Sequence, residues 1–395
     1  MLIQCTTNKP QPNILIVQLL FSLTIFLLSS CQNSGERPAE FSSYYLEKEE
    51  EFLIHSLASV ELLDYYPEDG LYLGYTITPD GNEITLVNEE GEIVLSKNMQ
   101  GEGPKQYPSN LSCLAFSETG EIWAMTSVQV LRYDQNLKLL EKFAYRSKFT
   151  INLYSILKRF PYFRKDTNSR EIIFPVVPSG VGRYDPGNYK KATLLEIYDR
   201  SQNFSKEIAP VSRRRVTEEF YGITGGSYAP VYALDAKNAI LYLTSTFDSE
   251  ISVYDLNVDS SPGSMDIYYE DPHAVEPPKP IGSHTLSSSA NNWLICPMNK
   301  AMYMLDNGMF ALEYLAETLI NPNPRTGLLV EFHPDNFKNR LILFDQNRQL
   351  SGDISIPERG IVMTSLPGNR LLVKAVNTEK EEDFTRYVIY KVVEE

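Results

Sequence analysis

Short apolar runs separated by turn-forming residues continue along the chain from Leu71 almost to its end. Each run has the length of a β-strand, and Gly, Asn, Asp and Pro stand between successive runs. In residues 121–140, three such runs are joined by a short link and by the turn Asp134-Gln135-Asn136. Short polar side chains bond their own backbone and tolerate left-handed geometry, so they suit a tight hairpin. The pattern predicts an all-β chain of antiparallel hairpins.

An apolar run that ends in Asp or Asn recurs along the chain. The copies end at Asn88, Asp134, Asp199, Asp255, Asp306 and Asp345, with a degenerate last copy at residues 388–391. Most intervals are close to the roughly 40–50 residues of a propeller repeat, which forms one four-stranded blade. Seven copies favour a β-propeller with seven four-stranded antiparallel blades. The copy at Asp306 lacks a preceding aromatic residue, and if this copy is left out, six blades are predicted.

The two chain ends are expected to meet in one blade. A strand from Phe41–Leu57 would complete the last blade, because pairing of the ends removes open sheet edges. Residues 43–395 would then form a single propeller domain, with loop insertions at Pro161–Lys191 and Asp259–Asn291. A pair of β-sandwiches is the alternative. Glu47–Leu57 and Phe310–Ile320 are the two segments with the length for a few helical turns.

The N-terminal segment has the order of a secretion signal. An apolar run, Ile14–Leu28, is followed by two small residues, by Cys31 and by a polar stretch. It is shorter than the roughly 20 apolar residues that span a bilayer. The order resembles a bacterial lipoprotein signal peptide. The resemblance implies removal of residues 1–30, a lipid on the thiol of Cys31 and a tether over residues 31–42. An ordinary secretory signal cleaved elsewhere is the alternative.

The residues after Cys31 indicate in which membrane, and on which face of it, the protein would be anchored. Gln32 is not the aspartate that favours inner-membrane retention in some bacteria, so the resemblance implies the outer membrane. The next residues carry only Glu36, whereas lipoproteins that some bacteria export to the cell surface carry a dense acidic run. A lipid-anchored protein on the periplasmic face is therefore favoured over one on the cell surface.

The net charge of the chain argues against one class of binding partner. The formal net charge of −15 argues against nucleic acid as a partner, and export from the cytoplasm argues against it further.

Once Cys5 is removed and Cys31 carries lipid, Cys113 and Cys296 are the two remaining cysteines. They could form a disulfide in an oxidising compartment. The apolar runs around both favour buried thiols instead.

One internal motif resembles a family signature. The segment Gly101-Glu102-Gly103-Pro104-Lys105-Gln106-Tyr107, together with Arg340–Glu395, resembles uncharacterised propeller lipoproteins of the Bacteroidota. These families are described as domains of unknown function. Lys105 and Gln106 depart from the Gly-Glu often found after the proline. The resemblance implies a six- or seven-bladed propeller and implies no activity, because the fold hosts enzymes and binding proteins alike.

Basic residues are concentrated in one part of the chain, where aromatic residues are also frequent. Arg213-Arg214-Arg215 is the densest group, and Lys158-Arg159 and Arg164-Lys165 precede it. Arginines bind carboxylates or phosphates through paired hydrogen bonds, and aromatic rings stack on sugars. His273 and His284 share a Pro-rich segment that could line the same site. Arg213, Arg214, Arg215, His273 and His284 are the predicted ligand-binding residues.

The sequence encodes no evident metal or cofactor site. No two histidines have metal-ligand spacing. Asp255, Asn257, Asp259 and Asp266 match positions 1, 3, 5 and 12 of a calcium loop. Ser260 stands where that loop needs glycine, so calcium is disfavoured.

The function predicted is a lipid-anchored, cell-envelope propeller that binds a glycan, a peptide or an envelope protein without catalysis. No Gly-x-Ser-x-Gly nucleophile elbow is present, and enzyme status is left open. A glycan-active hydrolase or lyase with its site at the mouth of the central channel is the alternative. A structural subunit of an outer-membrane assembly is the third hypothesis.

Overall fold

The structure, a computed structural model, describes residues 41–107, 111–126, 128–144, 150–151, 158–159, 162–163, 171–177, 189–199, 204–214, 229–270, 298–318, 337–375 and 383–395. Ser42–Glu395 form one compact unit. The predicted signal peptide and Cys31 lie outside the described residues, as do Arg215, His273, His284 and Cys296. No helix within the described ranges has the length and apolar character needed to cross a membrane.

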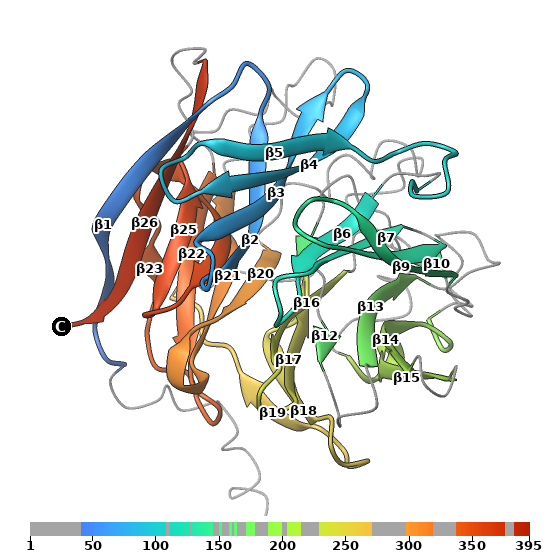
Figure 1. Cartoon of the computed structure of the whole chain (residues 1–395). Coiled ribbons are helices and arrows are strands. Elements are labelled where there is room, and N and C mark those ends of the chain that lie inside the picture. Colours follow the sequence, from blue (N-terminus) through green and yellow to red (C-terminus); the bar gives the residue numbers. More distant parts are fainter. Residues whose placement is uncertain are drawn as a thin grey trace, which may run out of the picture. The chain divides into compact units, whose positions relative to one another are not determined.

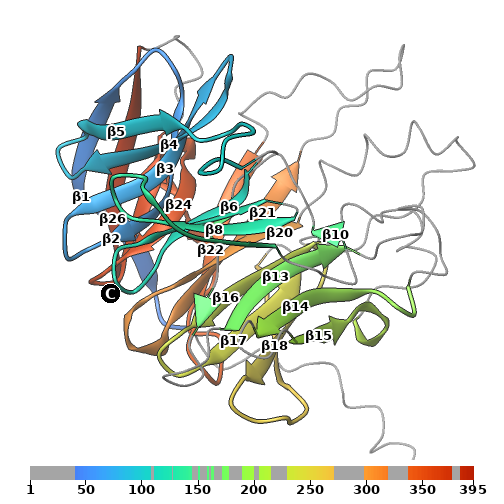
Figure 2. The same cartoon turned by 45° about the vertical axis from the view of Figure 1, so that its right-hand side comes forward.

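The described strands form six sheets, antiparallel except for one short strand, and these sheets are the blades of a propeller ring (Figures 1 and 2). Blade 1 contains β2 (Val60–Tyr66), β3 (Leu71–Thr78), β4 (Gly81–Asn88) and β5 (Ile93–Asn98). Blade 2 contains β6 (Leu111–Phe116), β7 (Ile122–Thr126), β8 (Gln129–Tyr133), β9 (Leu139–Ala144) and the short β11 (Lys158–Arg159), which is parallel to β6. Blade 3 contains β10 (Thr150–Ile151), β12 (Tyr162–Phe163), β13 (Glu171–Val177), β14 (Thr193–Asp199) and β15 (Phe204–Pro210).

The second half of the ring is more regular. Blade 4 contains β16 (Pro230–Asp235), β17 (Ile240–Ser245), β18 (Glu250–Asp255) and β19 (Gly263–Asp266). Blade 5 contains β20 (Met298–Met304), β21 (Phe310–Thr318), β22 (Phe337–Phe344) and β23 (Ile354–Ser355). Blade 6 contains β24 (Ile361–Leu366), β25 (Arg370–Lys374), β26 (Phe384–Glu394) and β1 (Tyr44–His55). The described residues also form three short 3-10 turns, η2 (Val211–Arg213), η4 (Asp306–Gly308) and η6 (Pro357–Arg359).

The N-terminal strand closes the ring by completing blade 6. β1 is antiparallel to β26, from Tyr44 opposite Glu394 to His55 opposite Phe384, and the two strands lie side by side in both views (Figures 1 and 2). This confirms the predicted pairing of the chain ends. The helical alternatives are wrong, because Glu47–Leu57 falls mainly in β1 and Phe310–Ile320 falls mainly in β21. Phe52 and Ile54 of β1 are both buried, which is the two-residue period of a strand.

The propeller has six blades, where the repeat count favoured seven. Asn88, Asp134, Asp199, Asp255 and Asp345 all stand at the end of the third strand of a blade, and residues 388–391 lie in the third strand of blade 6. Asp306 instead stands between the first and second strands of blade 5.

The hydrogen bonds of Asp306 differ from those of a third-strand corner. In a third-strand corner the Asp134 carboxylate accepts hydrogen bonds from the amides of Asn136 and Lys138, which fold the local turn. The Asp306 carboxylate accepts a hydrogen bond from the Gly368 amide of blade 6 at 2.7 Å. It therefore connects two blades, and the sequence alone does not distinguish the two uses of the same residue type.

The apolar core consists of six clusters among the described residues, and each cluster lies between two neighbouring blades. Leu73 of blade 1 packs in one cluster with Leu114 of blade 2. Ile54 of β1 packs in another with Val60 of blade 1 and Tyr387 of blade 6. Cys113 is buried in the cluster between blades 2 and 3. The hydrophobic stabilisation is thus distributed around the ring, and every blade buries both faces.

Candidate functional site between blades 3 and 4

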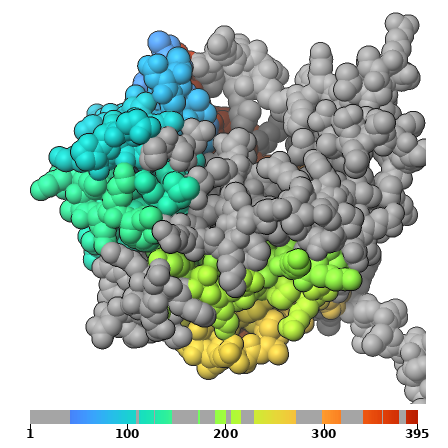
Figure 3. All heavy atoms as spheres, turned by 90° about the vertical axis from the view of Figure 1, so that its right-hand side faces the viewer, coloured from blue at the N-terminus to red at the C-terminus, as the bar shows by residue number. Residues whose placement is uncertain are grey.

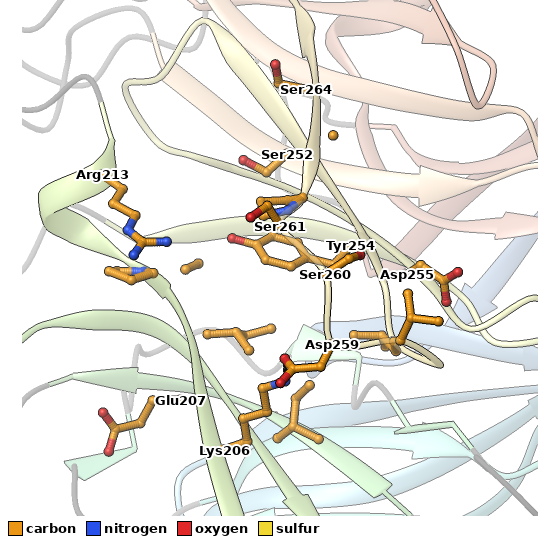
Figure 4. Close-up of a pocket in the computed structure, with 18 of the residues that line it drawn as sticks. Lys206, Glu207, Arg213, Ser252, Tyr254, Asp255, Asp259, Ser260, Ser261 and Ser264 are labelled. Carbon is orange, nitrogen blue, oxygen red and sulfur yellow. Dashed lines mark hydrogen bonds and ion pairs between the residues drawn. The ribbon is translucent and has the colours of Figure 1, made fainter.

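A groove of about 820 Å³ separates the outer strands of blades 3 and 4. Its volume lies within the roughly 300–1,000 Å³ of ligand-binding pockets. One wall is Lys206–Pro210 of β15, and the other comes from β18, β19 and the residues between them. Figure 3 shows the two regions as adjoining lime and yellow surfaces, and Figure 4 shows the groove in close-up. The groove thus lies between two neighbouring blades.

Two consecutive arginines at one end of the groove have opposite environments. The Arg213 side chain is exposed and points into the groove, toward Tyr254 and Ser252 (Figure 4). The Arg214 side chain is only 6% exposed, and its Nε donates to Asp248 Oδ2 at 2.7 Å. Its two terminal nitrogens donate to Ser252 Oγ at 2.6 Å and to the Leu243 carbonyl at 3.2 Å. Arg214, which follows the last strand of blade 3, therefore connects blade 3 to blade 4 through these hydrogen bonds.

The local sequence explains why the chain turns at this point. Ala209 adopts a left-handed backbone with φ of 58°, a strained conformation for a residue with a Cβ. Pro210 follows and leads into η2, whose Val211 is buried and donates its amide hydrogen bond to the Ala192 carbonyl at 2.9 Å. The Arg214 amide closes the turn on the Val211 carbonyl. Arg213 thus lies between two anchored residues, Val211 and Arg214.

Hydroxyl groups line the blade 4 wall. Ser252, Ser260, Ser261, Ser264 and Tyr254 all border the groove. Burial raises the pKa of the Tyr254 hydroxyl, and Arg214 and Arg213 partly offset this rise. Tyr254 therefore stays protonated at neutral pH and remains able to donate a hydrogen bond.

Carboxylates are the other abundant group around the groove. The lining acids are Asp199, Glu207, Glu250, Asp255 and Asp259. Asp259 pairs with Lys206 of the opposite wall at 2.6 Å, and both side chains are largely exposed. This ion pair crosses from blade 4 to blade 3 and neutralises one cation of the groove.

The calcium-loop residues take part in ordinary hairpin contacts. Asp255 accepts a hydrogen bond from the Asn257 amide at 2.9 Å, and Asp266 lies in β19 opposite Glu250. No group of three or more His, Cys, Asp or Glu side chains suited to a metal occurs in the part of the chain that the structure describes.

The structure brings together only some of the predicted site residues. Arg213 and Arg214 both line the groove, Arg213 as an accessible cation and Arg214 as a buried anchor. Lys158 and Arg159 form β11 of blade 2, and Arg215, His273 and His284 lie outside the described residues. Sequence reasoning missed Asp248, Ser252 and Tyr254. A cluster of serines after the Asp255 corner was the one local signal for the hydroxyl-lined wall.

Comparison with solved structures supports the fold. By sequence, no protein-family model and no curated protein matches the chain. A crystal structure of a DUF4221-family member from Bacteroides vulgatus is similar, with a TM-score of 0.64 at 11% identity over 90% of this chain and 100% of the other. A gluconolactonase from Xanthomonas campestris has a TM-score of 0.46 at 10% identity, over 90% of this chain and 100% of its own.

The similarity to the DUF4221-family structure concerns the fold. The predicted resemblance to Bacteroidota propellers of unknown function is confirmed at that level. Because propellers carry many unrelated activities, the function has to be argued from the groove itself.

Proposed function

We propose that this protein is a non-catalytic binding module of the cell envelope, anchored through a lipid on Cys31, and that its groove between blades 3 and 4 binds a glycan. The observation that supports this most directly is the convergence of Arg213, Tyr254 and four serine hydroxyls on one groove of about 820 Å³.

The polar lining matches the chemistry of a sugar. Serine hydroxyls donate and accept hydrogen bonds, carboxylates accept them, and a guanidinium donates in a fixed fork. A saccharide presents many hydroxyls that both donate and accept, together with apolar ring faces that pack on an aromatic side chain. The groove supplies each of these partners, and the ring of blades holds them on two rigid walls.

The described lining does not fit catalysis by an activated serine or cysteine. The described lining residues include neither histidine nor cysteine, so they contain no Ser–His or Cys–His pair. A serine without a neighbouring histidine base is not activated as a nucleophile, and its hydroxyl serves as a hydrogen-bonding group.

Binding is tested by screening the purified protein on envelope and dietary glycans, followed by calorimetry on each hit. Ser261→Trp is expected to obstruct the groove and abolish binding, whereas Ser43→Trp, at an exposed position before β1, should leave binding unchanged. Binding that survives Ser261→Trp would place the ligand elsewhere. Release of reducing ends or unsaturated sugars from any hit would overturn the non-catalytic proposal.

The lipid anchor is tested separately by metabolic labelling with palmitate. The full chain is expected to carry label and to sediment with membranes, and Cys31→Ser should lose both properties. Cys113→Ser is the matched control, because Cys113 is buried in the propeller. Equal labelling of the Cys31→Ser chain would contradict the anchor.

A further inference from the structure

We infer that the glycan bound in this groove contains an N-acetylated sugar, and that the Tyr254 hydroxyl and the Arg213 guanidinium donate hydrogen bonds to the carbonyl oxygen of its acetamido group. The inference rests on the proposed function and adds the class of sugar. It follows from the directions in which the hydrogen bonds around Tyr254 run, because these leave two donors facing the same end of the groove.

A chain of hydrogen bonds begins at the buried Arg214 and ends at Tyr254. A guanidinium donates hydrogen bonds and accepts none, so the Ser252 oxygen is the acceptor in its 2.6 Å contact with Arg214. The single proton of the Ser252 hydroxyl is therefore directed elsewhere. Burial raises the pKa of the Tyr254 hydroxyl, and a hydrogen bond from Ser252 is among the interactions that oppose this rise. The Tyr254 oxygen thus accepts from Ser252, and its own proton is left to donate to a ligand.

Arg213 adds a second donor beside this hydroxyl. Its exposed side chain points toward Tyr254 and Ser252 (Figure 4). The turn that carries it is fixed by the buried Val211 and by the hydrogen bonds of Arg214. Only the side chain of Arg213 has to be ordered on binding, which lowers the entropic cost of binding. The two donors therefore form a subsite for an oxygen that accepts hydrogen bonds.

An acetamido carbonyl fits this subsite better than a sugar hydroxyl does. A carbonyl oxygen has two lone pairs and no proton, so it accepts from Tyr254 and Arg213 together. A hydroxyl that accepts from both donors has to direct its own proton away from them. The acetamido group is also neutral, and the net charge of −15 on the chain disfavours an anionic ligand relative to a neutral one.

The walls at this end of the groove supply partners for the rest of the acetamido group. Its N–H needs an acceptor, and Ser264, opposite Ser252 in the pairing of β18 with β19, presents an exposed hydroxyl to the groove. Its methyl group needs apolar contact, and Ile208 and Pro210 border the groove on the blade 3 wall. Pro210 directly precedes η2, which contains Arg213. A donor pair, an acceptor and an apolar surface therefore match the three parts of an acetamido group.

Chitotetraose and cellotetraose test this inference, because they share chain length and linkage and differ in the acetamido group that replaces one hydroxyl of each sugar unit. Calorimetry is expected to show about 10- to 100-fold tighter binding of chitotetraose, since its carbonyl gains a neutral and a charge-assisted hydrogen bond. Cellotetraose with one unit oxidised to a uronic acid is the third probe. Equal or tighter binding of cellotetraose, or tightest binding of the uronic acid chain, would overturn the inference and leave the proposed glycan binding intact.

Tyr254→Phe tests the hydroxyl itself, because the variant keeps the aromatic ring. Both neutral tetrasaccharides are expected to bind the variant less tightly, with a loss of about 10-fold for chitotetraose and a smaller loss for cellotetraose, so the ratio of the two affinities falls. Tyr45→Phe is the matched control, because Tyr45 is 41% exposed in β1 of blade 6, and it should leave both affinities unchanged. Equal losses for the two chains would overturn the role of Tyr254. Failure of every saccharide to bind the groove would overturn the proposed function as well.

Discussion

The hydroxyl of Tyr387 lies 2.6 Å from the carbonyl oxygen of Val60, and these two residues belong to the last and the first blades of the ring. The same hydroxyl accepts a hydrogen bond from the Leu62 amide at 3.1 Å. One buried side chain therefore satisfies two backbone groups of β2 across the closing interface. These two hydrogen bonds join blade 6 to blade 1, whereas the pairing of β1 with β26 completes blade 6 itself.

Tyr387→Phe is expected to destabilise the propeller by about 1–3 kcal/mol, since it removes one hydroxyl and leaves a buried amide and a buried carbonyl without their partner. The free energy of unfolding in urea measures the loss. Tyr45→Phe is the control, because the Tyr45 side chain is 41% exposed, and it should change stability little. Equal stabilities of the Tyr387→Phe and wild-type chains would show that the hydroxyl contributes nothing to ring closure.

The ion pair between Arg214 and Asp248 is expected to be strongly coupled. Their side chains are 6% and 3% exposed, so removal of either partner leaves a charge in a desolvated position. Arg214→Met or Asp248→Asn alone should each cost about 3–5 kcal/mol, and the double variant should cost much less than their sum.

A second ion pair between the same two blades is the control for this cycle. Lys206 and Asp259 have side-chain exposures of 48% and 92%, so solvent screens their attraction. Lys206→Met combined with Asp259→Asn should show a coupling of about 1 kcal/mol or less. A similar coupling in the two cycles would mean that burial does not govern the strength of the Arg214 contact.

Gly74→Ala is expected to be among the most damaging small substitutions in the chain. A Cβ at Gly74 in β3 would lie 2.1 Å from the Glu61 carbonyl oxygen of β2, and a backbone atom cannot move aside without disturbing the blade. The cost should reach about 3 kcal/mol, the upper end of overpacking penalties. A Cβ at Gly263 in β19 would have its nearest neighbour at 3.9 Å. Gly263→Ala should therefore be neutral by the same urea unfolding measurement, and similar losses at both positions would contradict the steric argument.

The fold was predictable because its turns are encoded locally. The side chain of Asp134 bonds amides only two and four residues further on, so the hairpin is visible in a short stretch of sequence. The same holds for Asp345, which bonds the amides of Asn347 and Arg348. The blade number was harder to predict, because Asp306 forms its bond with Gly368 of the neighbouring blade.

The groove was predictable only in part, because its residues come from separate blades. The basic run identified Arg213 and Arg214, yet their different roles depend on Asp248, Ser252 and the Leu243 carbonyl, which lie about thirty residues or more further along the chain. Nothing in the sequence near Asp248 marks it as a partner for an arginine. Such contacts follow from the packing of blade 3 against blade 4.

Asp353 is expected to make the stability of blade 5 depend on pH. Burial raises the pKa of its carboxyl above the ordinary value, the Glu270 carboxylate adds to the rise, and the Tyr314 hydroxyl and Arg340 oppose it. The folded state therefore holds the proton more tightly than the unfolded state does. The resulting stabilisation is fully present below the unfolded carboxyl pKa of about 4 and is lost as the pH rises through the folded pKa.

Asp353→Asn removes this dependence, because an amide carries no charge and its carbonyl oxygen still accepts the hydrogen bond from Tyr314. The variant is expected to gain stability relative to the wild type near neutral pH, and the gain should fade as the pH falls through the raised folded pKa and be absent below about 4. Tyr314→Phe removes a hydrogen bond that favours the charged carboxylate, so it should raise the pH at which the wild-type stabilisation is lost. Urea unfolding of the three chains across this pH interval measures both effects. A gap between wild type and Asp353→Asn that stays constant with pH would show that the carboxyl titrates alike in the folded and unfolded chains.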